Sequence, residues 1–116
     1  MTIDDISKIC KGLRGTTTDI KWEDHLCFNV GDKMFLITSP DSVPVTASLK
    51  VCDDDFVELI QREGIIPAPY LARYKWIFLD DIDRLSPKEW THYAREAHRL
   101  IAEKLTLKTK KALGIS

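Results

Sequence analysis

Residues 25–38 read His-Leu-Cys-Phe-Asn-Val-Gly-Asp-Lys-Met-Phe-Leu-Ile-Thr, and this stretch decides the fold class. Two apolar, β-rich segments, 25–30 and 33–38, are separated by the dipeptide Gly31-Asp32. A two-residue connection of this kind forms a tight turn that requires positive φ and joins neighbouring antiparallel strands. The stretch therefore predicts a β-hairpin and, around it, an antiparallel sheet.

Further strands are expected on both sides of this hairpin. Residues 16–22 precede it as one strand, and residues 45–51 follow it as another after a loop rich in Ser and Pro. The run 75–79 predicts a central strand because it is apolar on both faces. Trp76 and Phe78 share one face of that strand, and we expect both to lie in the core.

Helices are predicted at both ends of the chain and between the fourth and fifth strands. Apolar residues recur at helical spacing over 3–12, and a run of aspartates opens a second helix over 54–62. Ser86-Pro87 followed by Glu89 is typical of a helix start, because the hydroxyl caps, the proline needs no N–H and the acid completes a capping box.

The last helix is expected to reach about residue 107 or to continue to residue 113. The element order is then α-β-β-β-β-α-β-α, which predicts an α+β two-layer sandwich with an antiparallel sheet packed by helices. A length of 116 residues, with no linker, repeat or low-complexity segment, predicts one domain over 1–116.

The net charge of −1 hides a strong asymmetry along the chain. Residues 1–83 carry 9 basic and 15 acidic side chains, whereas residues 84–116 carry 8 basic and 3 acidic ones. The near-zero total is therefore a cancellation between −6 and +5. A basic C-terminal helix and tail, at about 86–113, is the part that suits an anionic partner.

A helical wheel places this charge on one face of the last helix. One face is apolar and predicted to pack, namely Trp90, Ala94, Ala97, Ile101 and Leu105, and the opposite face carries Lys88, His92, Arg95 and Arg99. Seven cations are the predicted contacts to nucleic-acid phosphates: Lys88, Arg95, Arg99, Lys104, Lys108, Lys110 and Lys111. The alternative is a solvated helix face, since Arg99 can pair with Glu96 and Glu103.

Secondary contacts are expected from the sheet-bearing part of the chain: Lys33, Lys50, Arg73, Lys75, Tyr70 and Tyr74. The two tyrosines also support a rival hypothesis, in which an exposed apolar or aromatic patch serves a protein-interaction or chaperone-like adaptor. The oligomeric state stays open.

The residues give little support to an enzyme. His25 and Cys27 point to the same side of one strand, but no third group or oxyanion site accompanies them, so structural roles are expected for both. Three cysteines and three histidines lack metal-ligand spacing, and we expect neither a metal nor a cofactor. Acidic residues near the amino terminus and the absence of a long apolar run predict a cytoplasmic protein without a membrane span.

Several stretches together resemble the MmcQ/YjbR family in order and spacing. They are residues 22–35, 49–53 and 69–76, and residues 100–105 with the lysines that follow resemble that family's carboxyl end. The resemblance covers nearly the whole chain and implies a small α+β domain similar to secretion-chaperone-like or frataxin-like two-layer folds. Members are commonly labelled DNA-binding, and the family supplies no agreed catalytic residues.

Two positions depart from the pattern of that family. Ala97-His98 stands where many members have Ser-Tyr, and Leu105-Thr106 stands where Leu-Pro is usual. Without the proline the last helix is expected to continue. The leading hypothesis is a non-enzymatic cytoplasmic module that binds DNA through its last helix and tail.

Overall fold

The hairpin predicted from the sequence is present in the computed structural model, which describes residues 1–115. Strands β2 (His25–Val30) and β3 (Lys33–Ser39) pair antiparallel with each other. Both central residues of their turn have positive φ, 55° at Gly31 and 65° at Asp32. The two-residue turn thus has the backbone that the hairpin requires.

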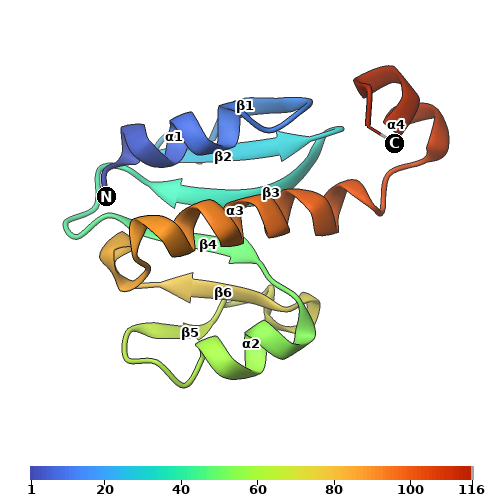
Figure 1. The fold of residues 1–116 in the computed structure, drawn as a ribbon. Coiled ribbons are helices and arrows are strands. Elements are labelled where there is room, and N and C mark those ends of the chain that lie inside the picture. Colours follow the sequence, from blue (N-terminus) through green and yellow to red (C-terminus); the bar gives the residue numbers. More distant parts are fainter. Residues whose placement is uncertain (116) are drawn as a thin grey trace.

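Four more strands extend this hairpin: β1 (Thr16–Lys21), β4 (Thr46–Lys50), β5 (Ile65–Pro67) and β6 (Trp76–Leu79). Every pair is antiparallel, and the strand order is β1-β2-β3-β4-β6-β5 (Figure 1). The sequence predicted only an extended connection around Pro67. Proline donates no ladder hydrogen bond, but β5 is an edge strand, where that loss is tolerated.

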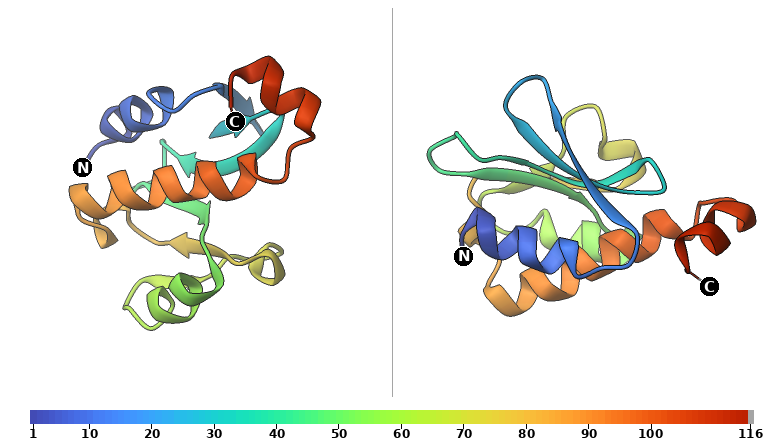
Figure 2. Two further views of the ribbon diagram at one scale, coloured as in Figure 1. Left: turned by 45° about the vertical axis from the view of Figure 1, so that its right-hand side comes forward. Right: turned by 90° about the horizontal axis from the view of Figure 1, so that it is seen from above.

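Helices α1 (Ile3–Lys11), α2 (Asp53–Leu59) and α3 (Pro87–Ala102) lie on one face of the sheet, and α4 (Leu107–Leu113) lies beyond its end near the β2–β3 turn (Figure 2). No α-helix covers the other face, which is called the uncovered face below. Two short 3₁₀ turns, η1 (Ala72–Tyr74) and η2 (Ile82–Arg84), lie in the connections around β6. The predicted α+β class is confirmed. No helix among residues 1–115 is long and apolar enough to cross a membrane.

The hydrophobic core lies between the sheet and α3. Ile77 and Leu79 of β6 are fully buried against it, together with Trp90, whose indole N–H donates to the Ile82 carbonyl at 2.7 Å. The expectation that Phe78 lies in this core is wrong, because side chains alternate along a strand and Phe78 faces the uncovered side. A strand that is apolar on both faces does not reveal which face packs.

The last helix is divided, contrary to the expectation of one continuous helix. Helix α3 ends at Ala102, and α4 starts after Thr106, whose extended backbone (φ −64°, ψ 155°) interrupts the helix. The Thr106 hydroxyl accepts a hydrogen bond from the Thr109 N–H at 3.2 Å. A threonine N-cap therefore starts a new helix at the position where the family usually has proline. Leu105 is buried in the intervening turn.

Candidate functional site

The outer face of α3 carries the basic residues that the sequence placed there. Four residues of this face are exposed: Lys88, His92, Arg95 and Arg99. The opposite face is buried, namely Trp90, Ala94, Ala97 and Ile101, and Leu105 is buried in the turn after α3. A capping box between Ser86 and Glu89 fixes where the helix starts, and with it the direction in which every later side chain points.

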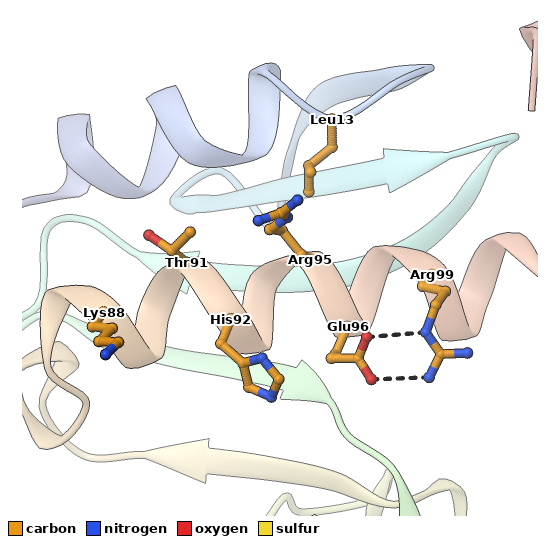
Figure 3. A pocket seen from close by; sticks show the side chains of 7 residues that line it. All are labelled: Leu13, Lys88, Thr91, His92, Arg95, Glu96 and Arg99. Atoms are coloured by element: carbon orange, nitrogen blue, oxygen red, sulfur yellow. Dashed lines mark hydrogen bonds and ion pairs between the residues drawn. The ribbon is translucent and has the colours of Figure 1, made fainter.

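The basic face borders an open groove of about 600 Å³ beside the end of α1. Its lining is formed by Leu13 and, from α3, by Lys88, Thr91, His92, Arg95, Glu96 and Arg99. Arg95 points toward Leu13, whereas Glu96 lies beside Arg99 (Figure 3). His98 Nε2 donates to the Arg14 carbonyl at 2.8 Å, and this bond ties the end of α1 to α3.

Arg99 differs from the other cations because two carboxylates neutralise it. Its guanidinium donates to both oxygens of Glu96, at 2.9 and 3.0 Å, and to Glu103 at 2.5 Å. These hydrogen bonds raise the pKa of Arg99 and lower that of Glu96. Lys88 and Arg95 have no carboxylate within 4 Å in the part of the chain that the structure describes.

Four lysines continue the positive charge beyond α3, on the turn and on α4: Lys104, Lys108, Lys110 and Lys111. None of them forms an ion pair with another residue of 1–115. Helix α4 is held by Arg14, whose guanidinium donates to the Gly114 carbonyl at 3.3 Å, and by Leu105, which lies against Gly31. The sequence could not predict these anchors because they join segments far apart in the chain.

The predicted secondary contacts do not form one surface. Lys50 is buried and its ammonium donates to the Tyr74 carbonyl, so it offers less of its charge to a ligand than the exposed lysines do. Burial lowers the pKa of Lys50, and nearby Lys104 lowers it further. Lys75 lies 5.1 Å over the Phe56 ring, Arg73 lies 5.1 Å over the Tyr74 ring, and Lys33 is exposed beside the β2–β3 turn.

His25 and Cys27 lie on the same side of β2, as expected, but the thiol is not activated. Cys27 is fully buried, and burial raises its pKa, which keeps the sulfur protonated and weakly nucleophilic. His25 Nδ1 lies 2.7 Å from the Asp24 carboxylate in the adjoining turn. Burial also raises the pKa of the Cys10 thiol, to about 12.

A second groove, of about 290 Å³, lies on the uncovered face of the sheet. Tyr70, singled out in the sequence, stands at it with 98% of its surface exposed, whereas Tyr74 does not line it. Sequence reasoning missed Trp22 and Phe78, which also line the groove. The signal for Phe78 was its alternation with Ile77, but only the packing of α3 decides which of the two faces outward.

A family model described as YjbR matches residues 11–100. The chain belongs to the YjbR family. The predicted resemblance is therefore confirmed, and α4 lies outside the matched residues. None of the curated proteins compared with the chain matches it significantly.

Two solved structures share the fold of this YjbR-family chain. Protein DR2400 of Deinococcus radiodurans, which carries the domain DUF419, is 25% identical with a TM-score of 0.87, over 99% of this chain and 89% of its own. A protein from Pseudomonas syringae is 20% identical with a TM-score of 0.69, over 86% of this chain and 98% of its own. The alignment with DR2400 extends over α4, which lies outside the residues matched by the family model.

Proposed function

We propose that the protein is a non-enzymatic module that binds the phosphate backbone of duplex DNA through the outer face of α3 and the lysines around α4. The observation that carries the proposal is that six cations on α3, on the turn after it and on α4 have no carboxylate within 4 Å among residues 1–115: Lys88, Arg95, Lys104, Lys108, Lys110 and Lys111. Cations that are not neutralised within the protein can replace the counterions of DNA phosphates.

The distribution of charge over the fold supports the same partner. Acidic side chains gather on the first turn of α2 and around η2, where Asp53–Asp55, Asp80 and Asp83 lie, and Asp53 lines an open groove together with Lys104. Asp80 is already paired with Arg84 at 2.8 Å. The net charge is −6 over residues 1–83 and +5 over residues 84–116, so the field of the protein favours an approach to a polyanion through α3 and α4.

The number of free cations sets an upper bound on the salt dependence of binding. With six phosphate contacts, the slope of log K against log salt concentration is about −5.4, at about 0.9 per contact. Affinity then falls by about a thousandfold between 50 and 200 mM salt. Contacts of this kind carry no base information, so little sequence preference is expected.

The experiment is a salt titration of binding to a fluorescently labelled duplex, followed by anisotropy, with wild type and two matched arginine variants. Arg95→Gln is expected to reduce the slope by about one contact, or 0.9. Arg84→Gln removes the same charge from η2, where Asp80 already pairs with Arg84 at 2.8 Å, and should leave the slope unchanged. A wild-type affinity that does not respond to salt refutes the proposal.

A further inference from the structure

The uncovered face of the sheet carries a groove whose lining contains no Lys, Arg, Asp or Glu side chain. Its floor comes from neighbouring strands, with Ile37 on β3, Ser48 on β4 and Phe78 on β6. In a chain with 30% charged residues such a neutral surface is a marked exception. It is complementary to an uncharged, apolar ligand and unsuited to the polyanion proposed for the helical side.

Two strongly exposed aromatic side chains stand at this groove, one from each side. Trp22, in the β1–β2 turn, is 71% exposed, and Tyr70, in the connection between β5 and β6, is 98% exposed. Both have left-handed backbones, with φ 52° at Trp22 and 67° at Tyr70. Bulky residues are strained in this region, where Gly or Asn is favoured, so local stability does not explain their presence.

The polar atoms of these residues are also free. Within residues 1–115, the Trp22 indole N–H and the Tyr70 hydroxyl have no hydrogen-bond partner, in contrast to the buried Trp90 indole, which donates to a carbonyl at 2.7 Å. Exposed aromatic rings with free donors suit a ligand that offers apolar surface together with unpaired carbonyl oxygens.

The extent of the groove favours an extended chain. It reaches from His25 on β2 across β3 and β4 to Phe78 on β6, which is three strand spacings. At about 4.8 Å per spacing this is about 14 Å. A polyproline II segment rises 3.1 Å per residue, so about five residues span the groove.

We propose that this groove binds an uncharged, proline-rich segment of a partner protein in the polyproline II conformation. Such a segment has no internal hydrogen bonds, so its carbonyls are available to the Trp22 and Tyr70 donors while its rings pack on the aromatic faces. The inference is independent of DNA binding, because it uses the opposite side of the sheet. It also gives the adaptor hypothesis a defined site, with Trp22 as the residue that the sequence did not suggest.

The test uses a fluorescently labelled, uncharged ten-residue peptide rich in proline, with a peptide of equal length built from alanine and serine as the comparison ligand. Binding to the full chain is measured by anisotropy at 50 and 500 mM salt. The proline-rich peptide is expected to bind and the comparison peptide to bind at least about tenfold more weakly. Salt should have little effect, because no charge pair forms.

Two variants, Trp22→Asn and Tyr70→Asn, remove the rings while keeping a residue that tolerates positive φ. Each is expected to weaken peptide binding by about tenfold or more and to leave DNA binding unchanged. Val57→Asn, at an exposed apolar position of α2 (59% exposed), is the matched control and should bind the peptide like wild type. Circular dichroism and thermal unfolding establish that all three variants fold.

Three outcomes overturn the inference: no binding of the proline-rich peptide, equal binding of both peptides, or unchanged binding in folded Trp22→Asn and Tyr70→Asn. None of them affects the DNA proposal, whose readout is a salt-dependent affinity that depends on Arg95. Conversely, a flat DNA titration leaves the peptide result standing.

Discussion

Replacing Glu96 and Glu103 by glutamine is expected to strengthen binding to duplex DNA. Both carboxylates now accept hydrogen bonds from Arg99, which lies on the same helix face as Lys88 and Arg95. Removing the two negative charges turns Arg99 from a neutralised cation into a free one. The number of free cations on the proposed surface then rises from six to seven.

The size of the gain follows from counterion release. One added contact steepens the slope of log K against log salt from about −5.4 to about −6.3. The added contact is taken to contribute nothing at about 1 M salt. The gain in affinity is then about 15-fold at 50 mM salt, about eightfold at 100 mM and about fourfold at 200 mM. The eightfold gain corresponds to about 1.2 kcal/mol. The cost to folding is small, because Arg99 is 50% and Glu103 57% exposed in these pairs and water screens them.

The assay is the anisotropy titration with labelled duplex at several salt concentrations. Glu58→Gln with Glu63→Gln is the matched control, since it changes the net charge equally but neither residue lines the α3 groove. Adding Arg99→Gln to the Glu96 and Glu103 changes should return the slope to that of wild type. The reasoning is refuted if the control gives the same gain, or if the gain survives the loss of Arg99.

Three further predictions concern the framework that holds these surfaces. Gly31→Ala should cost about 1–3 kcal/mol in urea unfolding, because φ is 55° and a Cβ would lie 2.8 Å from Leu105. Trp90→Phe should cost about 1–3 kcal/mol in the same assay, because it leaves the buried Ile82 carbonyl without its donor. Burial raises the pKa of Cys10 to about 12, so wild type should lose its stability advantage over Cys10→Ala by about 1.4 kcal/mol per pH unit above pH 9.

Each of these predictions has its own control. Gly12→Ala should be close to neutral, since Gly12 has a right-handed backbone and a Cβ there meets its neighbours at 3.4 Å. Trp22→Phe makes the same change at a side chain that is 71% exposed and should leave stability nearly unchanged, which ties the cost at Trp90 to burial. For Cys10, the folded state favours the neutral thiol and the unfolded chain ionises first, so a stability difference that rises with pH would contradict the predicted sign.

Local patterns were sufficient for most of the fold. The Gly31-Asp32 turn, the cap at Ser86 and the apolar face of α3 each depend on residues a few positions apart, and all are present in the structure. The burial of Trp90 and the exposure of Lys88 followed from helical spacing alone, because the period of 3.6 residues leaves one face for packing.

Features that depend on distant segments could not be predicted in this way. The three-residue strand β5 forms because β6 pairs with it. The break before α4 depends on two features, the local cap at Thr106 and the packing of Leu105 on the distant Gly31 turn. The pairing of Arg99 on the basic face could be predicted only in part from the sequence. The spacing of Glu96, Arg99 and Glu103 allowed the pairing, but only the side-chain geometry decides that it neutralises Arg99.

The sequence by itself determined the fold class, the family and the polarity of charge between the two parts of the chain, since these are properties of composition and local order. The tertiary structure decided which face of the sheet α3 covers, and therefore which residues the other face exposes. Trp22, Tyr70 and Phe78 are far apart in the chain and share one groove because antiparallel pairing places β2, β3, β4 and β6 side by side. No local pattern specifies such a surface, because its members meet only when the sheet has formed.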